Sequence, residues 1–197
     1  TASVSAIEHM QRAVFAQPVV GVDLEWGALG SWVQPTLALM QVATPSEVFL
    51  VDMVLMPDTK EAIGSFLQAL LGNKTPLVLG FAFHNDLREL RRSPWADSCN
   101  EVRGLCDLQE ISGQQREGLQ SLVRRVLNKP FCKGEQKSHW HRRPLRQSQR
   151  HYAALDAHVL LQVAAALADV PLEEPNDLAA ALVDLGDKQS HSVGVNG

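Results

Sequence analysis

The sequence predicts an α/β fold in which helices flank a mixed five-stranded sheet. Three strand-like stretches come first, and amphipathic helices then alternate with two further strands. The first three strands indicate antiparallel pairing, and the later βα units indicate parallel pairing. With 197 residues, 45% of them hydrophobic, the chain is long enough to form one well-buried domain.

The N-terminal stretch supplies the first helix and the antiparallel strands. Apolar residues at helical spacing predict a helix over 5–15. The β-branched run at 19–26 predicts a buried strand, and a turn rich in glycine and proline follows it at 27–35. Two more strands are predicted at 37–42 and 48–51, joined by a short hairpin.

The middle of the chain alternates between helix and strand. An amphipathic helix is predicted over 59–71 and a largely apolar fourth strand over 76–83. The next helix is expected to stop just before Pro94, because the residue before a proline disfavours helical geometry. A weak fifth strand is predicted at 101–106, which completes the sheet.

After the fourth strand the predicted domain is mainly helical, and it contains a basic loop. His84 and Asn85 offer capping chemistry for the helix after the fourth strand. A helix over 118–127 leads into a polar, basic loop over 128–143. A long helix is then expected to start near Pro144, where proline is tolerated, and to reach Val170.

The chain is expected to contain one domain over 1–170. Residues 171–197 show only a short helix-like patch and a polar tail. We therefore interpret them as a C-terminal extension or linker toward a further domain outside this sequence. The missing N-terminal methionine also suggests a piece of a longer protein, with protein partners or domains beyond it.

The cysteines and the hydropathy of the chain indicate the cellular compartment in which the protein is expected. The three cysteines, Cys99, Cys106 and Cys132, show no C-x-x-C spacing, which suits a reducing compartment and predicts no zinc site. Neither a signal pattern nor an apolar run of the ~20 residues needed to span a bilayer is present. We expect an intracellular protein, cytoplasmic or nuclear, without membrane partners.

The charge is strongly asymmetric. The net charge is −4, yet residues 116–151 contain ten Lys or Arg against two acids, a balance of +8 that leaves −12 for the remainder. A basic segment on an acidic chain suggests a polyanionic partner such as nucleic acid, although a solvated basic face is the alternative. The arginines that we expect to contact phosphates are Arg124, Arg125, Arg142 and Arg143.

Two acids at the end of the first strand are the first candidate site. Asp23 and Glu25 are two residues apart, so both side chains leave the same face of the strand. Two unpaired carboxylates there would repel each other, and Mg²⁺ or Mn²⁺ would remove that conflict. The alternative is a strand that simply ends in two solvated acids.

Further polar residues occur in the later helices. Tyr152 and Asp156 are four residues apart in the long helix and therefore share one face. Asp86 follows the fourth strand but is ambiguous by itself. Asp52 and Asp107 also end strands, and we interpret both as turn acids.

Three motifs make the chain resemble the ribonuclease D-like 3′–5′ exonucleases of the DnaQ superfamily. They are V-G-V-D-L-E-W, G-F-A-F-H-N-D-L and the string R-P-L-R-Q-S-Q-R-H-Y-A-A-L-D-A, and the match runs in order from about residue 5 to 170. Within the superfamily the second motif most resembles the Nibbler/mutator-seven branch, which trims small RNAs. The resemblance implies a ribonuclease H-like fold.

The resemblance also implies a site and a reaction. Two Mg²⁺ or Mn²⁺ ions would be held by four acids and would drive release of nucleoside 5′-monophosphates from a single-stranded 3′ end. The implied catalytic residues are Asp23, Glu25, Asp86, Tyr152 and Asp156, of which the four acids bind metal. The expected nucleic-acid contacts are Leu24, Trp26, His84, Asn85, Arg124, Arg125, Trp140, Arg142 and Arg143. Among them, Trp26 and Trp140 are candidates for base stacking, although burial in the core is the commoner fate of a tryptophan.

Two points depart from this pattern or compete with it. His139 stands where bacterial relatives often carry a small acid or asparagine, which bears on the nucleotide contacts. A sister group uses a histidine five residues before the last aspartate, and His151 has that spacing from Asp156. On a helix His151 would lie about 140° from Asp156 and Tyr152 only about 40°, so we favour Tyr152.

Two rival functions remain open at the level of sequence. A catalytically silent nucleic-acid-binding module would have the same fold, although silent relatives usually lose at least one metal acid. A metal-dependent phosphatase for small molecules would not need the basic segment at 116–151. The sequence does not distinguish RNA from DNA as substrate, and we favour RNA.

Overall fold

The computed structural model describes residues 4–27, 35–54 and 59–193, with side chains described as far as residue 189. Its centre is one five-stranded sheet with the strand order β3-β2-β1-β4-β5. Most of the turn predicted at 27–35, namely residues 28–34, lies outside the described residues. Among the described residues, no helix has both the length and the apolar character needed to cross a membrane. The three cysteines all fall within the described ranges and are free.

The sheet is mixed, as predicted. Its strands are β1 (Val19–Gly27), β2 (Thr36–Ala43), β3 (Val48–Asp52), β4 (Leu77–Gly80) and β5 (Leu105–Asp107). The pairs β1–β2 and β2–β3 are antiparallel, whereas β1–β4 and β4–β5 are parallel. The order puts β1 at the centre, so its side chains are covered on both faces.

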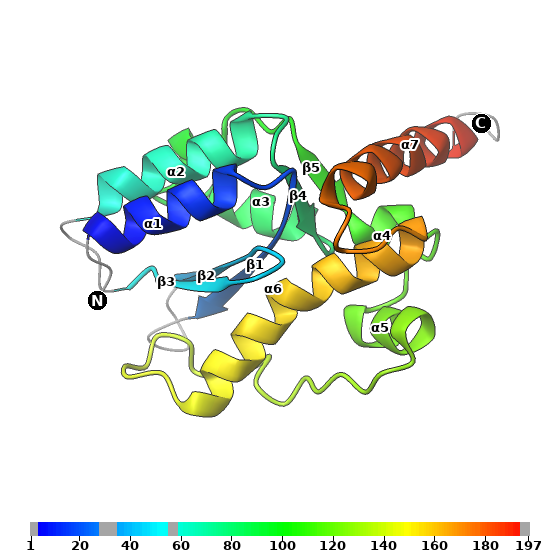
Figure 1. Ribbon diagram of the computed structural model, residues 1–197. Coiled ribbons are helices and arrows are strands. Elements are labelled where there is room, and N and C mark those ends of the chain that lie inside the picture. Colours follow the sequence, from blue (N-terminus) through cyan, green and yellow to red (C-terminus); the bar gives the residue numbers. More distant parts are fainter. Residues whose placement is uncertain (1–3, 28–34, 55–58, 194–197) are drawn as a thin grey trace.

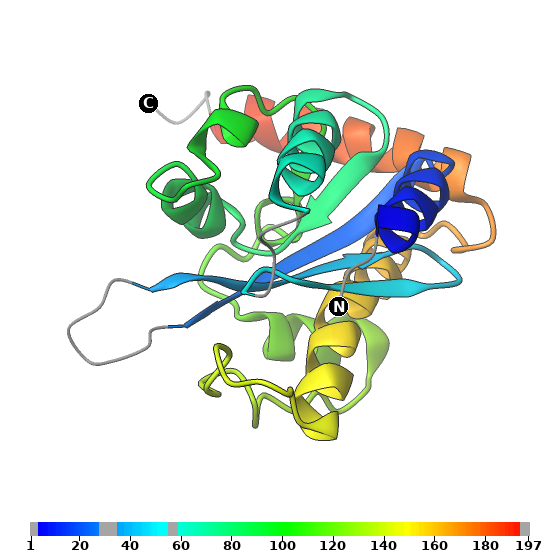
Figure 2. The same cartoon turned by 90° about the vertical axis from the view of Figure 1, so that its left-hand side faces the viewer.

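Helices cover both faces of the sheet (Figures 1 and 2). Helices α1 and α2 lie on one face, and α6 crosses β1, β2 and β3 on the other, with α5 beside it. Apolar residues cluster in the same two layers. The helices of the described part are α1 (Val4–Phe15), α2 (Lys60–Gly72), α3 (His84–Leu90), α4 (Leu108–Ile111), α5 (Leu119–Leu127), α6 (Gln147–Ala168) and α7 (Pro175–Val193).

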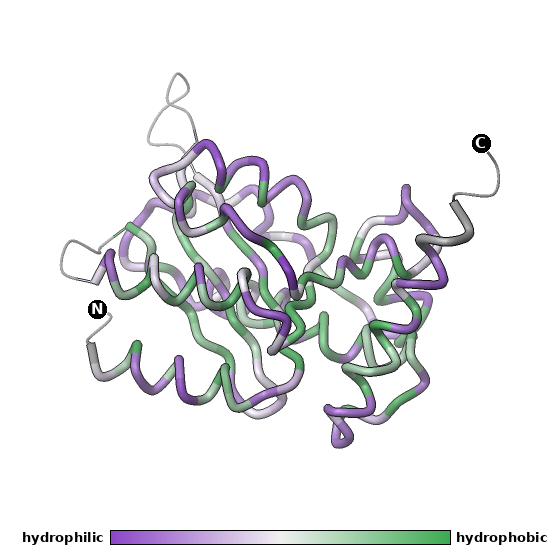
Figure 3. Tube along the Cα trace, turned by 90° about the horizontal axis from the view of Figure 1, so that it is seen from above, coloured by the Kyte–Doolittle hydropathy of each residue, from purple (hydrophilic) through white to green (hydrophobic). Residues whose placement is uncertain are grey.

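Side chains alternate along β1, so the residues that pack into the core and the candidate site residues leave opposite faces of the strand. Val20, Val22 and Leu24 point into the cluster that contains the buried residues of α1 and α2. Asp23 and Glu25 therefore leave the opposite face, toward α6. The tube in Figure 3 shows hydrophobic residues along the central strands and mixed residues along the helices.

The junction between β4 and α3 differs from the prediction. β4 ends at Gly80 and not at residue 83. The carboxylate of Asp107 at the end of β5 accepts the N–H groups of Ala82 (2.9 Å) and Phe83 (2.8 Å), which turns the chain into α3. His84 and Asn85 are therefore first-turn residues of α3, and their predicted role as caps is wrong.

The boundaries of several other elements also differ. β5 has three residues and begins at Leu105, not at 101. α6 begins at Gln147 and not near Pro144, because the side chain of Gln149 accepts the N–H of Arg146 (3.0 Å) and closes the first turn there. The short helix α4 and a 3₁₀ turn at Ala96–Cys99 were not predicted.

The C-terminal part folds back on the domain. α7 has 19 residues, so it is much longer than the predicted patch. Its Leu178 and Leu182 are buried in the same apolar cluster as Leu160 and Leu161 of α6. The domain boundary at residue 170 stays a prediction, and the apolar contact shows that α7 packs on the structure before it.

Candidate active site

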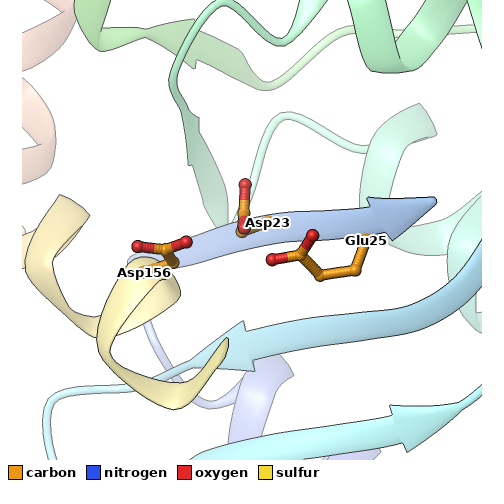
Figure 4. Close-up of side chains that lie close together, drawn as sticks. All are labelled: Asp23, Glu25 and Asp156. Atoms are coloured by element: carbon orange, nitrogen blue, oxygen red, sulfur yellow. The ribbon is translucent and has the colours of Figure 1, made fainter. Parts of the chain in front are cut away.

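Three of the predicted acids converge on one point (Figure 4). Asp23 and Glu25 extend from β1 and Asp156 from α6, and each offers a carboxylate oxygen within 4.8 Å of the others. Glu25 and Asp156 are buried, with exposed fractions of 7% and 5%. Asp156 is more than 130 residues from Asp23 and Glu25 in the chain, so their convergence is a product of the fold.

Close packing of α6 on β1 creates this convergence. A Cβ at Gly21 would collide with the carbonyl oxygen of Ala157, so only glycine lets the helix approach so closely. Asp156 precedes that contact by one residue, and Asp23 follows Gly21 by two on the same face of β1. The helix therefore delivers Asp156 to the carboxylates of the strand.

The carboxylates resist ionisation in the absence of a cation. Burial, followed by the charges of Asp23, Asp156 and Asp86, raises the pKa of Glu25 to about 10. Burial and the neighbouring Asp156 and Asp86 hold the pKa of Asp23 well above its usual range. Burial also raises the pKa of Asp156 to about 6. Each shift marks a carboxyl group whose charged form has too little compensating positive charge nearby.

The donor set fits a hard divalent cation. All three groups offer oxygen, which Mg²⁺ and Mn²⁺ prefer. Among the described residues, Oδ1 of Asp156 is buried without a hydrogen-bond partner. A buried carboxylate oxygen rarely stays unpaired, and neighbouring acids cannot satisfy it while they are ionised. The cluster therefore fits the implied metals.

Asp86 stands slightly apart from the cluster. It belongs to the first turn of α3 and lines the same pocket of about 280 Å³ as Asp23, Glu25 and Asp156. The indole N–H of Trp26 donates to its Oδ1 at 2.7 Å. Burial raises the pKa of Asp86 to about 6, and the hydrogen bond from Trp26 opposes that rise. The indole thus holds one oxygen of a carboxylate that borders the pocket.

Tyr152 lies beside the acids. Its ring packs against Trp140, with ring centroids 6.1 Å apart, and it lines the same pocket as Asp156. Burial and the surrounding acids raise the pKa of Tyr152 far above its usual range, so the hydroxyl stays protonated. His151 is exposed and does not line the acidic pocket; it borders a second pocket, which Tyr152 also lines. The structure therefore puts the tyrosine and not the histidine at the carboxylates.

Two polar residues of the pocket were missed by sequence reasoning. Lys133 and Gln136 line the pocket from the basic loop, and the charge of Lys133 lowers the pKa of both Asp23 and Asp156. Lys133 is thus the nearby positive charge that partly offsets the acids. The only signal for it in the sequence was its place in the basic segment, which does not distinguish it from nine other cations.

The comparisons with known proteins identify the family. A family model described as 3′–5′ exonuclease matches residues 3–170 of this chain. The chain belongs to the 3′–5′ exonuclease family. It is 34% identical to the human exonuclease mut-7 homolog over 186 residues, which is 83% of this chain and 21% of that protein. The chain thus spans about a fifth of the length of that curated relative.

Solved structures show the same exonuclease fold. The Aedes aegypti Nibbler EXO domain matches with a TM-score of 0.78 and 24% identity, covering 93% of this chain and 92% of that one. Escherichia coli RNase D matches with a TM-score of 0.71 and 25% identity, covering 96% of this chain and 48% of that one. The resemblance to ribonuclease D and the Nibbler/mutator-seven branch is therefore confirmed.

Two predicted nucleic-acid contacts of the exonuclease are wrong. Trp140 is 1% exposed and packs with Leu39 and Tyr152, so its ring is not available for base stacking. Arg143 forms a bidentate ion pair with Asp52 at 2.6 and 2.8 Å, and it also donates to the carbonyl oxygen of Trp140. Hydrogen bonds to the sheet and to the loop use the N–H donors of Arg143, so this side chain holds the loop in place.

The other predicted contacts occupy varied positions. Leu24 and Asn85 line the acidic pocket, although the side chain of Leu24 is buried in the core. His84 is exposed beside Asp107, and Arg125 pairs with Glu117 at 2.7 Å. The roles of these residues in binding stay predictions, as do those of Trp26 and of the exposed Arg124 and Arg142.

Arg142 and Arg143 are adjacent and are expected to behave differently. Arg143→Ala breaks a partly buried bidentate pair, at a cost of about 2 kcal/mol, and should lower the melting temperature by about 4–8 °C. Arg142→Ala should leave the melting temperature unchanged and lower the salt slope of nucleic-acid binding by up to about 1. Thermal unfolding and binding at several salt concentrations measure both effects. An unchanged melting temperature for Arg143→Ala contradicts its role as an anchor.

Proposed function

We propose that this domain removes nucleotides from the 3′ end of single-stranded RNA and releases nucleoside 5′-monophosphates. One observation carries the proposal: carboxylates from β1 and α6 converge beside Asp86 and Tyr152, with a buried oxygen of Asp156 unpaired within the described part of the chain. Such a set suits two-metal phosphodiester hydrolysis.

Asp23, Glu25, Asp156 and Asp86 would hold the two Mg²⁺ or Mn²⁺ ions. When bound, the ions acidify a water and neutralise charge on the reacting phosphate. Tyr152 stays protonated beside Asp156 and can position the attacking water by a hydrogen bond. Lys133 borders the same pocket and can contact the phosphate of the departing nucleotide. Trp26 keeps Asp86 oriented toward the pocket.

RNA is the substrate that we favour. The structure of Escherichia coli RNase D is described as that of an exoribonuclease involved in structured RNA processing. The basic segment at 116–151 suits contacts to a phosphate backbone without reading the bases. We further propose that the RNA substrates are small RNAs, which the domain trims. We also propose that the protein acts inside the cell, together with partner domains beyond this chain. A silent binding module is the competing function.

The assay uses the purified chain and 5′-labelled single strands of RNA and DNA with one sequence. We expect stepwise shortening from the 3′ end with Mg²⁺ or Mn²⁺, faster for RNA, and none in excess chelator. Asp86→Asn is the matched control, because it removes one ligand charge at constant volume and should behave like chelation. RNA that is bound but never shortened in Mn²⁺ would instead support the silent module. Shortening that persists in excess chelator contradicts the metal mechanism.

A further inference from the structure

One buried polar side chain next to the acids has no assigned role. Gln41 lies in the middle of β2 with an exposed fraction of 0%. Neither its Nε2 nor its Oε1 has a hydrogen-bond partner among the residues that the structure describes. A buried primary amide with both ends unpaired is costly, so its presence in an otherwise apolar strand calls for a partner.

The register of the sheet places Gln41 beside the catalytic acids. Gln41 is directly opposite Asp23 of β1 and opposite Leu50 of β3. Residues directly opposite in antiparallel strands share a face and have Cβ atoms about 4.5–5.5 Å apart. The Gln41 side chain therefore leaves the sheet on the face that carries Asp23 and Glu25, under α6.

Small residues of α6 make room for the amide at this point. Ala157 contacts Gly21, and Ala153 packs with Leu39 in one cluster. Along β1 and β2 the pair Asp23–Gln41 lies between these two contacts, because Gly21 and Leu39 are each two residues away on the same face. Ala153 and Ala157 are both fully buried, so α6 seals the amide from solvent.

The unpaired atoms are chemically complementary. Oδ1 of Asp156 is the other buried oxygen of this region without a partner in the described part of the chain. It can only accept when ionised, whereas Nε2 of Gln41 can only donate. Both residues neighbour Asp23, one across the strand pair and one through the carboxylate cluster.

We infer that Gln41 is a positioning residue. When divalent cations occupy the cluster, its amide N–H donates a hydrogen bond to the inner oxygen of Asp156, Oδ1, either directly or through one buried water. A donor on the inner oxygen fixes the rotamer of the carboxylate and leaves the other oxygen for the cation. Such outer partners of metal ligands typically change metal affinity by about 10–100-fold. This inference rests on the proposed function, because it requires the acids to bind metal.

The test measures Mn²⁺ affinity by titration calorimetry without RNA. Gln41→Met keeps the length of the side chain and removes its donors. We expect a Kd for Mn²⁺ about 10–100-fold weaker than wild type. The melting temperature in chelator should be equal or higher, since two unpaired polar atoms are gone. A merely structural glutamine would, when replaced, lower the melting temperature and leave the Kd for Mn²⁺ unchanged.

Gln149→Met is the matched control. Gln149 is also buried, at 2% exposed, but its Nε2 donates to Ser138 at 2.8 Å and its Oε1 accepts from Arg146. Its replacement should lower the melting temperature and leave the Kd for Mn²⁺ near wild type. Replacing Gln41 is thus expected to weaken metal binding without loss of stability, and replacing Gln149 to lower stability without loss of metal binding.

Three outcomes separate the inference from the proposed function. A folded Gln41→Met protein with a Kd within twofold of wild type overturns the inference and leaves the function standing. Wild type that binds no Mn²⁺ overturns both. If Gln41→Met does not fold, a structure of wild type with Mn²⁺ decides. Nε2 of Gln41 hydrogen-bonded to Asp156, directly or through one water, supports the inference, and any other partner or none overturns it.

Discussion

Tyr152→Phe is expected to lower the rate of the chemical step by about 10²–10⁴-fold, the usual contribution of a positioned acid–base or orienting group. The substitution removes one hydroxyl and keeps the ring that packs on Trp140. Metal and RNA affinity should hardly change, because the four acids are untouched. Single-turnover kinetics measure the effect, since product release would otherwise mask the chemistry.

His151→Ala is the matched control for Tyr152→Phe. His151 is exposed, and the pocket that it lines includes Tyr152 but none of the four candidate metal ligands. Its removal should leave the single-turnover rate within a few-fold of wild type. A protein in which His151→Ala abolishes cleavage and Tyr152→Phe is nearly unaffected would belong with the histidine group of exonucleases.

Asp156→Asn is expected to stop trimming and at the same time to stabilise the metal-free protein. Burial raises the pKa of Asp156 from its usual value of 3.8 to about 6, so the folded state binds its proton more tightly than the unfolded state. Ionisation therefore costs stability as the pH rises from about 4 to 6, and the loss persists above pH 6. An amide removes this cost, which is about 3 kcal/mol at most.

Thermal unfolding in chelator at pH 5 and pH 8 measures this effect. Wild type should melt at a lower temperature at pH 8 than at pH 5, because Glu25, Asp86 and Asp156 all have raised pKa values. Asp156→Asn should raise the melting temperature at pH 8 by about 4–8 °C, for a gain of about 2 kcal/mol, and less at pH 5. A lower melting temperature at pH 8 would show that the carboxylate stabilises the fold without metal.

The fold could be predicted because its main signals are local. β-branched runs and helical spacing mark β1, β2 and α6, and the order of strands and helices sets the mixed sheet. The boundaries that were missed depend on distant residues. β4 stops at Gly80 because Asp107, more than 20 residues later, accepts the N–H groups of the next turn. No pattern within β4 carries that information.

The acids of the site could be predicted from the sequence, but the roles of several residues around them could not. The spacing of Asp23 with Glu25 and of Tyr152 with Asp156 sets a shared face within each element. The prediction that Trp140 and Arg143 contact nucleic acid was wrong, because partners that bury them lie far away in the chain. Asp52, for example, is 91 residues from Arg143.

Other side chains of the site gave no local signal at all. Gln41 sits in a strand that reads as apolar, and the hydrogen bond from Trp26 to Asp86 joins residues 60 positions apart. Lys133 carries the same charge as its neighbours in the basic segment. Only the register of the sheet and the path of α6 reveal which of these residues reach the acids.

Titration of the metal-free chain with Mn²⁺ tests the central claim, that the converging carboxylates form a metal centre. We expect saturable binding of two ions per chain in calorimetry, with fewer ions or much weaker binding for Asp156→Asn. No saturable binding in wild type would contradict the claim, and so would binding to Asp156→Asn that matches wild type in number and affinity.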